Sequence, residues 1–176
     1  AADHYPDIHI IATGSSVMEG VSKYRDTLTG RKLSIKITPI NSFDMSDFGS
    51  KDIKHRMLRG GMPEFFLSKT ADESLYQEWM DAYWSKDIQE LFRLERKHSF
   101  QSFVELIMMQ SGGIFNASGI ASKCGVSHTT ANNYLKVLEA TLVAAVVRPY
   151  SAHSQTEIVS APKVYGFDTG FVCYHK

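Results

Sequence analysis

The stretch from Asn116 to Pro149 constrains the fold more than any other, because it carries two helix signals separated by a single glycine. A side-chain oxygen of Asn116 or Ser118 would cap the first helix, and Gly125 would end it in a left-handed conformation. Ser127 is a preferred cap for a second helix. Five apolar residues recur there at helical spacing and are predicted to point inward: Ala131, Tyr134, Leu135, Leu138 and Leu142.

The opposite face of this second helix is polar. We predict that five of its side chains point outward: His128, Thr129, Asn132, Asn133 and Lys136. A short helix, a glycine turn and a polar second helix form the helix-turn-helix pattern, whose second helix can lie in the major groove of DNA. The apolar run Val143–Val147 and the segment Lys163–Phe167 are predicted to be paired strands around a polar loop. Together these elements predict a winged helix.

The first 40 residues carry a strand, helix, strand pattern. Asp7–Thr13 is a continuous apolar run, which is typical of a buried strand, and Val17–Leu28 has the spacing of a helix. Lys32–Ile40 alternates apolar and polar residues as a strand does. One βαβ crossover is therefore predicted at the start of the chain.

The middle of the chain is helical in pattern. A helical stretch after Asn41 must break at Gly60-Gly61, just before Pro63. A long amphipathic helix is predicted over Ala71–Glu95, with its aromatic residues in the core, and an apolar helix over Gln101–Gln110. We therefore predict an α+β, mostly helical fold in three regions, which are an α/β part at 1–49, a helical region at 50–98 and a winged-helix domain at 99–176.

Composition limits the class of protein. With 176 residues, of which 43% are hydrophobic, the chain can build one good core or two small ones. Its formal net charge is zero, so binding of nucleic acid would need a local basic patch. Cys124 and Cys173 are too far apart in sequence to suggest a disulfide framework or a metal site, which favours a reducing compartment, and we expect the cytoplasm. No apolar run approaches the ~20 residues that span a bilayer, and no signal peptide pattern occurs, so no membrane association is predicted.

Six motifs occur in one order over nearly the whole chain, from Ile10 to Gly170. They are IIATGSS, LTGR, ITPINSF, RGGMP, YWSKDI and, after the helix-turn-helix, APKVYGFDTG. In this order they resemble the prokaryotic AAA-type P-loop ATPases that carry a winged-helix, DUF4143-type C-terminal region. The resemblance implies that residues 1–49 are the C-terminal part, or remnant, of a P-loop ATPase α/β sheet.

The resemblance also implies roles for particular residues. Thr13, Ser15 and Ser16 fall where these ATPases keep the sensor-1 polar group, which orients water near the γ-phosphate. Arg31 matches a family arginine that would contact phosphate from the same or a neighbouring subunit. The resemblance assigns no clear role to five other motif residues: Gly60, Gly61, Pro63, Lys86 and Asp87.

Two motifs of the family are absent from this chain. It has no GxxxxGK[ST] phosphate loop and no apolar strand that ends in an Asp-Glu pair. In the family both lie upstream of the sensor-1 strand, so ATP and Mg²⁺ are expected only in a full-length parent. For this chain alone we expect no catalytic residue, no cofactor and no metal site. We also expect residues 7–40 either to pair with a missing N-terminal ATPase segment or to repack, because their strands would otherwise have open edges.

Two further functions remain open. The winged helix would be a module for binding double-stranded DNA, with bases or phosphates contacted by His128, Thr129, Asn132, Asn133, Lys136, Arg148 and Lys163. Against this hypothesis, one lysine in the second helix is few for a surface that must neutralise several phosphates. Alternatively, the unit would dock on the ATPase core or a neighbouring subunit through apolar surface at Leu142–Val147, Trp79 and Trp84.

Overall fold

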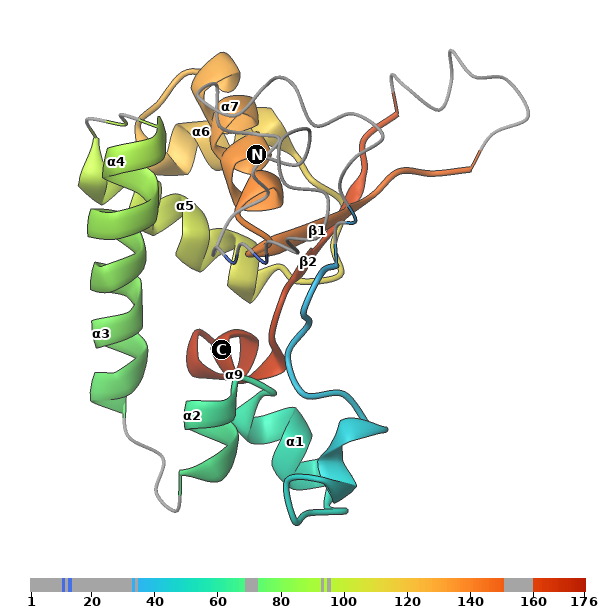
Figure 1. Ribbon diagram of the computed structural model, residues 1–176. Coiled ribbons are helices and arrows are strands. Elements are labelled where there is room, and N and C mark those ends of the chain that lie inside the picture. The colour runs from blue at the N-terminus through green and yellow to red at the C-terminus, as the bar shows by residue number, and fades with distance from the viewer. Residues whose placement is uncertain are drawn as a thin grey trace, which may run out of the picture.

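Figure 1 shows the computed structural model of the chain, which describes residues 11, 13, 33, 35–68, 73–92, 94, 96–150 and 160–176. The fold of these residues is α+β and mostly helical, as predicted. In chain order the elements are η3 (Asp44–Ser46), α1 (Ile53–Arg59), α2 (Pro63–Leu67), α3 (Glu73–Ala82), the π-helical η4 (Tyr83–Ile88), α4 (Gln89–Phe92), α5 (Lys97–Met109), α6 (Ala117–Cys124), α7 (His128–Ala140), β1 (Ala144–Val147), β2 (Lys163–Gly166) and α9 (Thr169–Tyr174).

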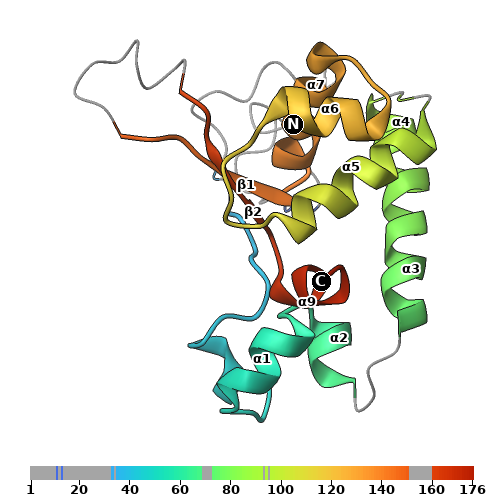
Figure 2. The same cartoon turned by 180° about the vertical axis from the view of Figure 1, so that it is seen from behind.

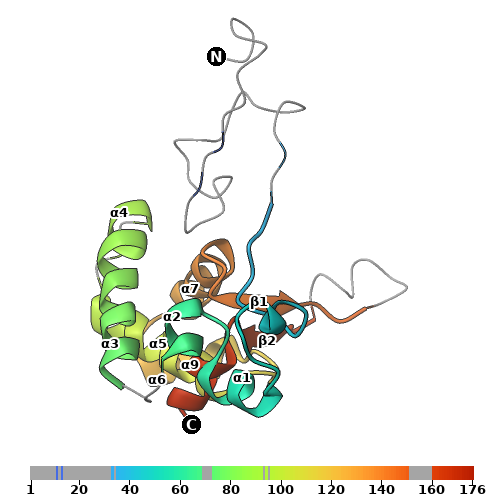
Figure 3. The same ribbon diagram turned by 60° about the horizontal axis from the view of Figure 1, so that its bottom comes forward.

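The helices gather at two ends of the molecule. Helices α1, α2 and α9 lie at one end, α5, α6 and α7 lie at the other, and α3 runs along one side (Figure 1). The view from behind in Figure 2 shows the same grouping. The tilted view in Figure 3 shows the β1–β2 hairpin on the side of the molecule away from α3. The hairpin continues directly into α9 and so links the two ends.

The predicted caps of the helix-turn-helix are confirmed. Asn116 Oδ1 accepts a hydrogen bond from the backbone N–H of Gly119 at 3.0 Å and caps α6. Gly125 ends that helix in the left-handed region, with φ at 63°. Ser127 Oγ accepts from the N–H of Thr130 at 3.0 Å and caps α7. These local signals fix where each helix begins and ends.

The predicted wing is also confirmed. β1 and β2 pair antiparallel, with Ala144 opposite Gly166 and Val147 opposite Lys163. β1 leaves α7 after a tight turn, so α5, α6, α7 and the hairpin follow one another in the order of a winged helix.

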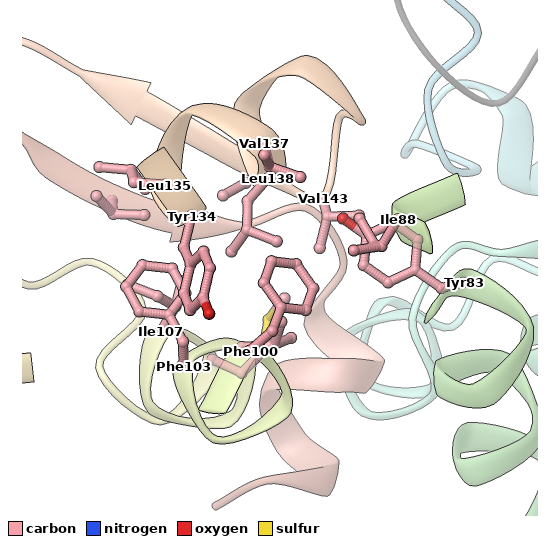
Figure 4. Close-up of a cluster of buried hydrophobic side chains, with 14 of the residues drawn as sticks. Tyr83, Ile88, Phe100, Phe103, Ile107, Tyr134, Leu135, Val137, Leu138 and Val143 are labelled. Atoms are coloured by element: carbon pink, nitrogen blue, oxygen red, sulfur yellow. The ribbon is translucent and has the colours of Figure 1, made fainter. Parts of the chain in front are cut away.

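One hydrophobic core orients α7. Figure 4 shows Tyr134 and Leu138 of α7 facing Phe100 and Phe103 of α5, and all four side chains are buried. The Tyr134 ring packs edge to face on both phenylalanines, with ring centroids 5.1 and 5.5 Å apart. This packing turns the opposite, polar face of α7 outward.

The long helix predicted over Ala71–Glu95 is confirmed between Glu73 and Phe92, but it contains the π-helical segment η4. Trp84 and Ile88 of that segment are buried, as the predicted core aromatics and aliphatics should be. Periodicity alone did not indicate the π-helical turn, because it moves the apolar stripe by only one position.

A buried carboxylate joins two segments that lie 107 residues apart in the chain. Asp168, which is 2% exposed, accepts hydrogen bonds from the N–H of Gly61 at 2.6 Å and from the N–H of Gly170 at 2.9 Å. The Arg56 guanidinium lies 3.8 Å from the same carboxylate. A Cβ atom at Gly60, whose φ is +83°, would overlap the carboxylate oxygen Oδ1. The RGGMP and FDTG motifs therefore pack on one another.

Arg56 extends this junction to two further segments. Its Nε donates a hydrogen bond to the carbonyl oxygen of Ile40, and its Nη1 donates to Thr169 Oγ1 at 3.0 Å. The N–H of Ile40 in turn donates to the carbonyl oxygen of Gly61 at 2.6 Å. Helix α1, the residues before η3 and the first turn of α9 are thus held together by one polar cluster.

The strand predicted over Lys32–Ile40 is wrong in its described part. Residues 35–40 pair with no strand among the residues that the structure describes. Ile35 and Ile37 are 78% and 86% exposed, because the alternating pattern finds no neighbouring strand to cover them. The strand predicted over Asp7–Thr13 is described only at residues 11 and 13, and the helix predicted over Val17–Leu28 lies outside the described residues.

Leu142 was predicted to point inward from a helix, and this is wrong. Helix α7 ends at Ala140, and the N–H groups of Leu142 and Val143 donate back to the carbonyl oxygens of Glu139 and Leu138 at 3.2 and 2.8 Å. This is the Schellman arrangement, which places Leu142 where glycine is usual. Its φ is 61° and its side chain is 38% exposed. The helix end was missed because the residue that usually marks it is absent.

We predict that Gly60→Ala lowers the free energy of unfolding by about 3 kcal/mol, because the new methyl group meets the Asp168 carboxylate. Gly49→Ala is the matched control, since Gly49 also has a positive φ of +74° but has no atom within 4 Å of the added Cβ. It should cost only the backbone strain, about 1 kcal/mol. Urea unfolding followed by circular dichroism measures both, and equal losses would contradict the proposed contact.

We predict that the Leu142→Gly variant is more stable than the Leu142→Ala variant by about 1 kcal/mol. Both remove the same side-chain contacts, but only glycine relieves the left-handed backbone. Thermal and urea unfolding of the two variants measure the difference. An alanine variant as stable as the glycine variant would show that no strain is stored at this turn.

Candidate nucleic-acid interface

Three polar side chains form an exposed stripe on α7. Thr129, Asn133 and Lys136 are exposed, and their spacing of four and then three residues places them on one face of the helix. The stripe lies opposite Tyr134 and Leu138, which are buried against α5. These three residues were predicted to point outward, and this prediction is confirmed.

His128 and Asn132 form a second polar pair on α7, and the two residues differ in their exposure to solvent. His128 is exposed, whereas Asn132 is half-buried. The Asn132 side-chain amide donates a hydrogen bond to the carbonyl oxygen of His128 at 3.0 Å and lies 3.3 Å from each nitrogen of its ring. The Asn132 side chain is therefore hydrogen-bonded to the backbone of its own helix.

The wing carries two basic residues, of which Arg148 contacts α7. Lys163 lies on β2 opposite Val147, and both are exposed. Arg148 follows β1, and its guanidinium lies 4.0 Å from the Glu139 carboxylate, with both side chains about half exposed. An exposed ion pair of this length is weak, so Arg148 can exchange this partner for a phosphate.

The winged-helix domain carries only a small excess of positive charge. Over 99–176 the basic residues are Lys123, Lys136, Arg148, Lys163 and Lys176, and the acidic residues are Glu105, Glu139, Glu157 and Asp168. The formal net charge of this domain is therefore +1, so any phosphate contact depends on the placement of a few basic side chains. Lys123, in the last turn of α6, was not predicted as a contact residue, because the helix-turn-helix pattern points to the second helix and the wing.

A buried hydrogen bond fixes the C-terminal end of α7. The Tyr83 hydroxyl lies 2.7 Å from Thr141 Oγ1, which donates to the carbonyl oxygen of Val137 at 2.8 Å. Burial raises the pKa of Tyr83 far above its ordinary value, so the phenol stays protonated and keeps this bond. The π-helical segment thus anchors the helix that carries the polar stripe.

A mainly apolar groove of about 380 Å³ lies beside this contact. Its walls include Pro39, Pro63, Trp79, Lys86 and Leu142. Trp84, which was considered as a docking residue together with Trp79, is only 7% exposed and belongs to the core. Of the two tryptophans, Trp79 alone lines the groove.

Of the predicted nucleotide-sensing residues, the structure describes one. Thr13 is described and exposed, whereas Ser15, Ser16 and Arg31 lie outside the described residues. Cys124 is buried in the core, and burial raises the pKa of its thiol. Among the described residues, no group of three or more His, Cys, Asp or Glu side chains could hold a metal ion. No helix in the described ranges has the length and apolar character needed to cross a membrane.

Comparison with known proteins gives distant relatives of unknown function. The chain is 25% identical over 163 residues to "Uncharacterized protein Rv2008c" of Mycobacterium tuberculosis and to "Uncharacterized protein Mb2031c" of Mycobacterium bovis. The match covers 90% of this chain but only 36% of each relative. No solved structure matches the chain.

One protein family covers most of the chain. Residues 50–176 match the profile of the family described as "Domain of unknown function (DUF8612)". The matched range begins just before α1 and contains both the Asp168 junction and the winged helix. The chain therefore belongs to the DUF8612 family.

Proposed function

We propose that this chain is the C-terminal portion of an AAA-type ATP-binding protein and that it does not hydrolyse ATP on its own. The observation that carries the proposal is the junction at Asp168. Two of the motifs that resemble the ATPase family, RGGMP and FDTG, meet there through Gly60, Gly61 and Gly170. Motifs that pack together are better explained as parts of one inherited architecture than as chance matches.

The lengths of the relatives support the same proposal. The chain spans 36% of the two mycobacterial proteins, so proteins similar to it contain a long additional segment. A phosphate loop and an acidic strand in such a segment would supply ATP and Mg²⁺ binding. Thr13, Ser15 and Ser16 would then orient the attacking water, and Arg31 would stabilise the charge that develops on the transferred phosphoryl group.

We predict no ATP turnover by the purified chain and measurable turnover by the protein encoded by the complete reading frame. In that longer protein Arg31→Ala should lower kcat by about 10³-fold, the scale of arginines that contact the γ-phosphate. Arg96→Ala is the matched control, because Arg96 is exposed at the start of α5 and should leave kcat unchanged. Release of inorganic phosphate measures both. Turnover by the 176-residue chain, or a complete frame without a phosphate loop, would contradict the proposal.

Binding of double-stranded DNA by the winged helix is a second candidate function. It is favoured by four basic residues on or next to α6, α7 and the hairpin, which are Lys123, Lys136, Arg148 and Lys163. The polar stripe on α7 occupies the position that enters the major groove in winged-helix proteins, and Lys163 would contact a flanking phosphate. Docking of the groove beside Trp79 on a neighbouring domain is compatible with both functions.

If DNA is bound in this way, Lys136→Ala should weaken binding several-fold for every DNA sequence. The plot of log binding constant against log salt concentration should become less steep, by about 0.9 in slope. Lys51→Ala removes the same charge near α1, at the other end of the molecule, and should change neither quantity. Fluorescence anisotropy of a labelled duplex at several salt concentrations measures the slope. Equal effects of the two variants would show that α7 is not the contact surface.

A further inference from the structure

The two adjacent asparagines of α7 differ in what they can offer to a partner. The Asn132 amide donates to the carbonyl oxygen of His128 at 3.0 Å, and the residue is half-buried. Asn133 is exposed, and its side chain makes no hydrogen bond within the part of the chain that the structure describes. Among the described residues the Asn133 amide therefore keeps its oxygen and both N–H groups available, whereas Asn132 has an N–H committed to the helix backbone.

Asn133 also occupies the centre of the exposed stripe. Thr129 lies one turn before it and Lys136 one turn after it, so a hydroxyl and an ammonium group flank the amide. Asn133 lies in the second turn of α7, and the N-terminal residues of a recognition helix are those that reach base edges. The flanking hydroxyl and ammonium groups suit phosphate oxygens, which position a protein without specifying sequence.

The chemistry of a free amide selects one base. Adenine presents a donor at N6 and an acceptor at N7 in the major groove, and a carboxamide pairs with both at once. Guanine presents two acceptors there, which call for an arginine or lysine. The stripe holds no arginine, and its lysine lies three residues from Asn133.

We propose that Asn133, and not Asn132, is the base-contacting residue of this winged helix and that the base is an adenine in the major groove. Asn132 instead donates to the backbone carbonyl oxygen of His128 within the helix. The inference rests on the second candidate function, binding of double-stranded DNA, and it does not depend on the ATPase proposal.

The test compares Asn133→Ala, Asn132→Ala and Asn133→Arg with the wild-type chain. A library of duplexes with a randomised central segment gives the preferred sequence, and anisotropy titrations then compare that duplex with one in which the contacted A·T pair is G·C. Wild type and Asn132→Ala should prefer the A·T duplex by at least about fivefold. Asn133→Ala should lose this preference while its affinity for unrelated duplex stays unchanged, and Asn133→Arg should turn the preference toward guanine.

The outcomes separate this inference from the function on which it rests. Binding of duplex by the wild-type chain without any adenine preference would overturn the role of Asn133 and leave DNA binding intact. Loss of preference in Asn132→Ala but not in Asn133→Ala would also overturn it. Failure of the wild type to bind any duplex at low salt would overturn both claims. Asn133 is exposed and Asn132 is half-buried, and a single cooperative urea transition for each variant confirms that the fold is retained.

Discussion

A carboxylate buried inside a protein needs hydrogen bonds and a positive charge to replace the water that it loses. Asp168 obtains these from the N–H groups of Gly61 and Gly170 and from the guanidinium of Arg56. The approach is so close that Gly60 can carry no side chain. One buried side chain thereby fixes the end of α1 against the start of α9.

This junction adds to the hydrophobic core, which packs the long helix, α5, α6, α7, the hairpin and α9 together. α9 continues directly from β2, so fixing its first turn also fixes the strand that pairs with β1. β1 follows α7, whose C-terminal end is tied to the long helix by the hydrogen bond between Tyr83 and Thr141. The polar stripe of α7 is therefore presented on a rigid base, which a recognition surface requires.

Local signals were sufficient to predict the winged helix. The caps at Asn116 and Ser127, the left-handed Gly125 and the short apolar run of β1 each depend on a few neighbouring residues, and all agree with the structure. The rest depends on contacts between distant segments. The Leu142 turn lacks its usual glycine, and nothing in the sequence indicates that residues 35–40 stay unpaired among the described strands.

The candidate site was predictable to a similar degree. The outward residues of α7 follow from helical spacing, but the withdrawal of Asn132 toward His128 depends on side-chain geometry that no pattern reveals. In the same way, Gly60 and Gly61 had no assigned role until Asp168 was seen against them, because that partner lies 107 residues away.

The most direct test of this account is native-state hydrogen exchange at the backbone amide of Gly61, measured by NMR. If Asp168 holds the two segments together, this amide should exchange only through global unfolding, with the same opening free energy as the amide of Leu138 in the core. Exchange through a local opening, with an opening free energy well below that of the Leu138 amide, would show that the junction opens independently of global unfolding and does not organise the fold.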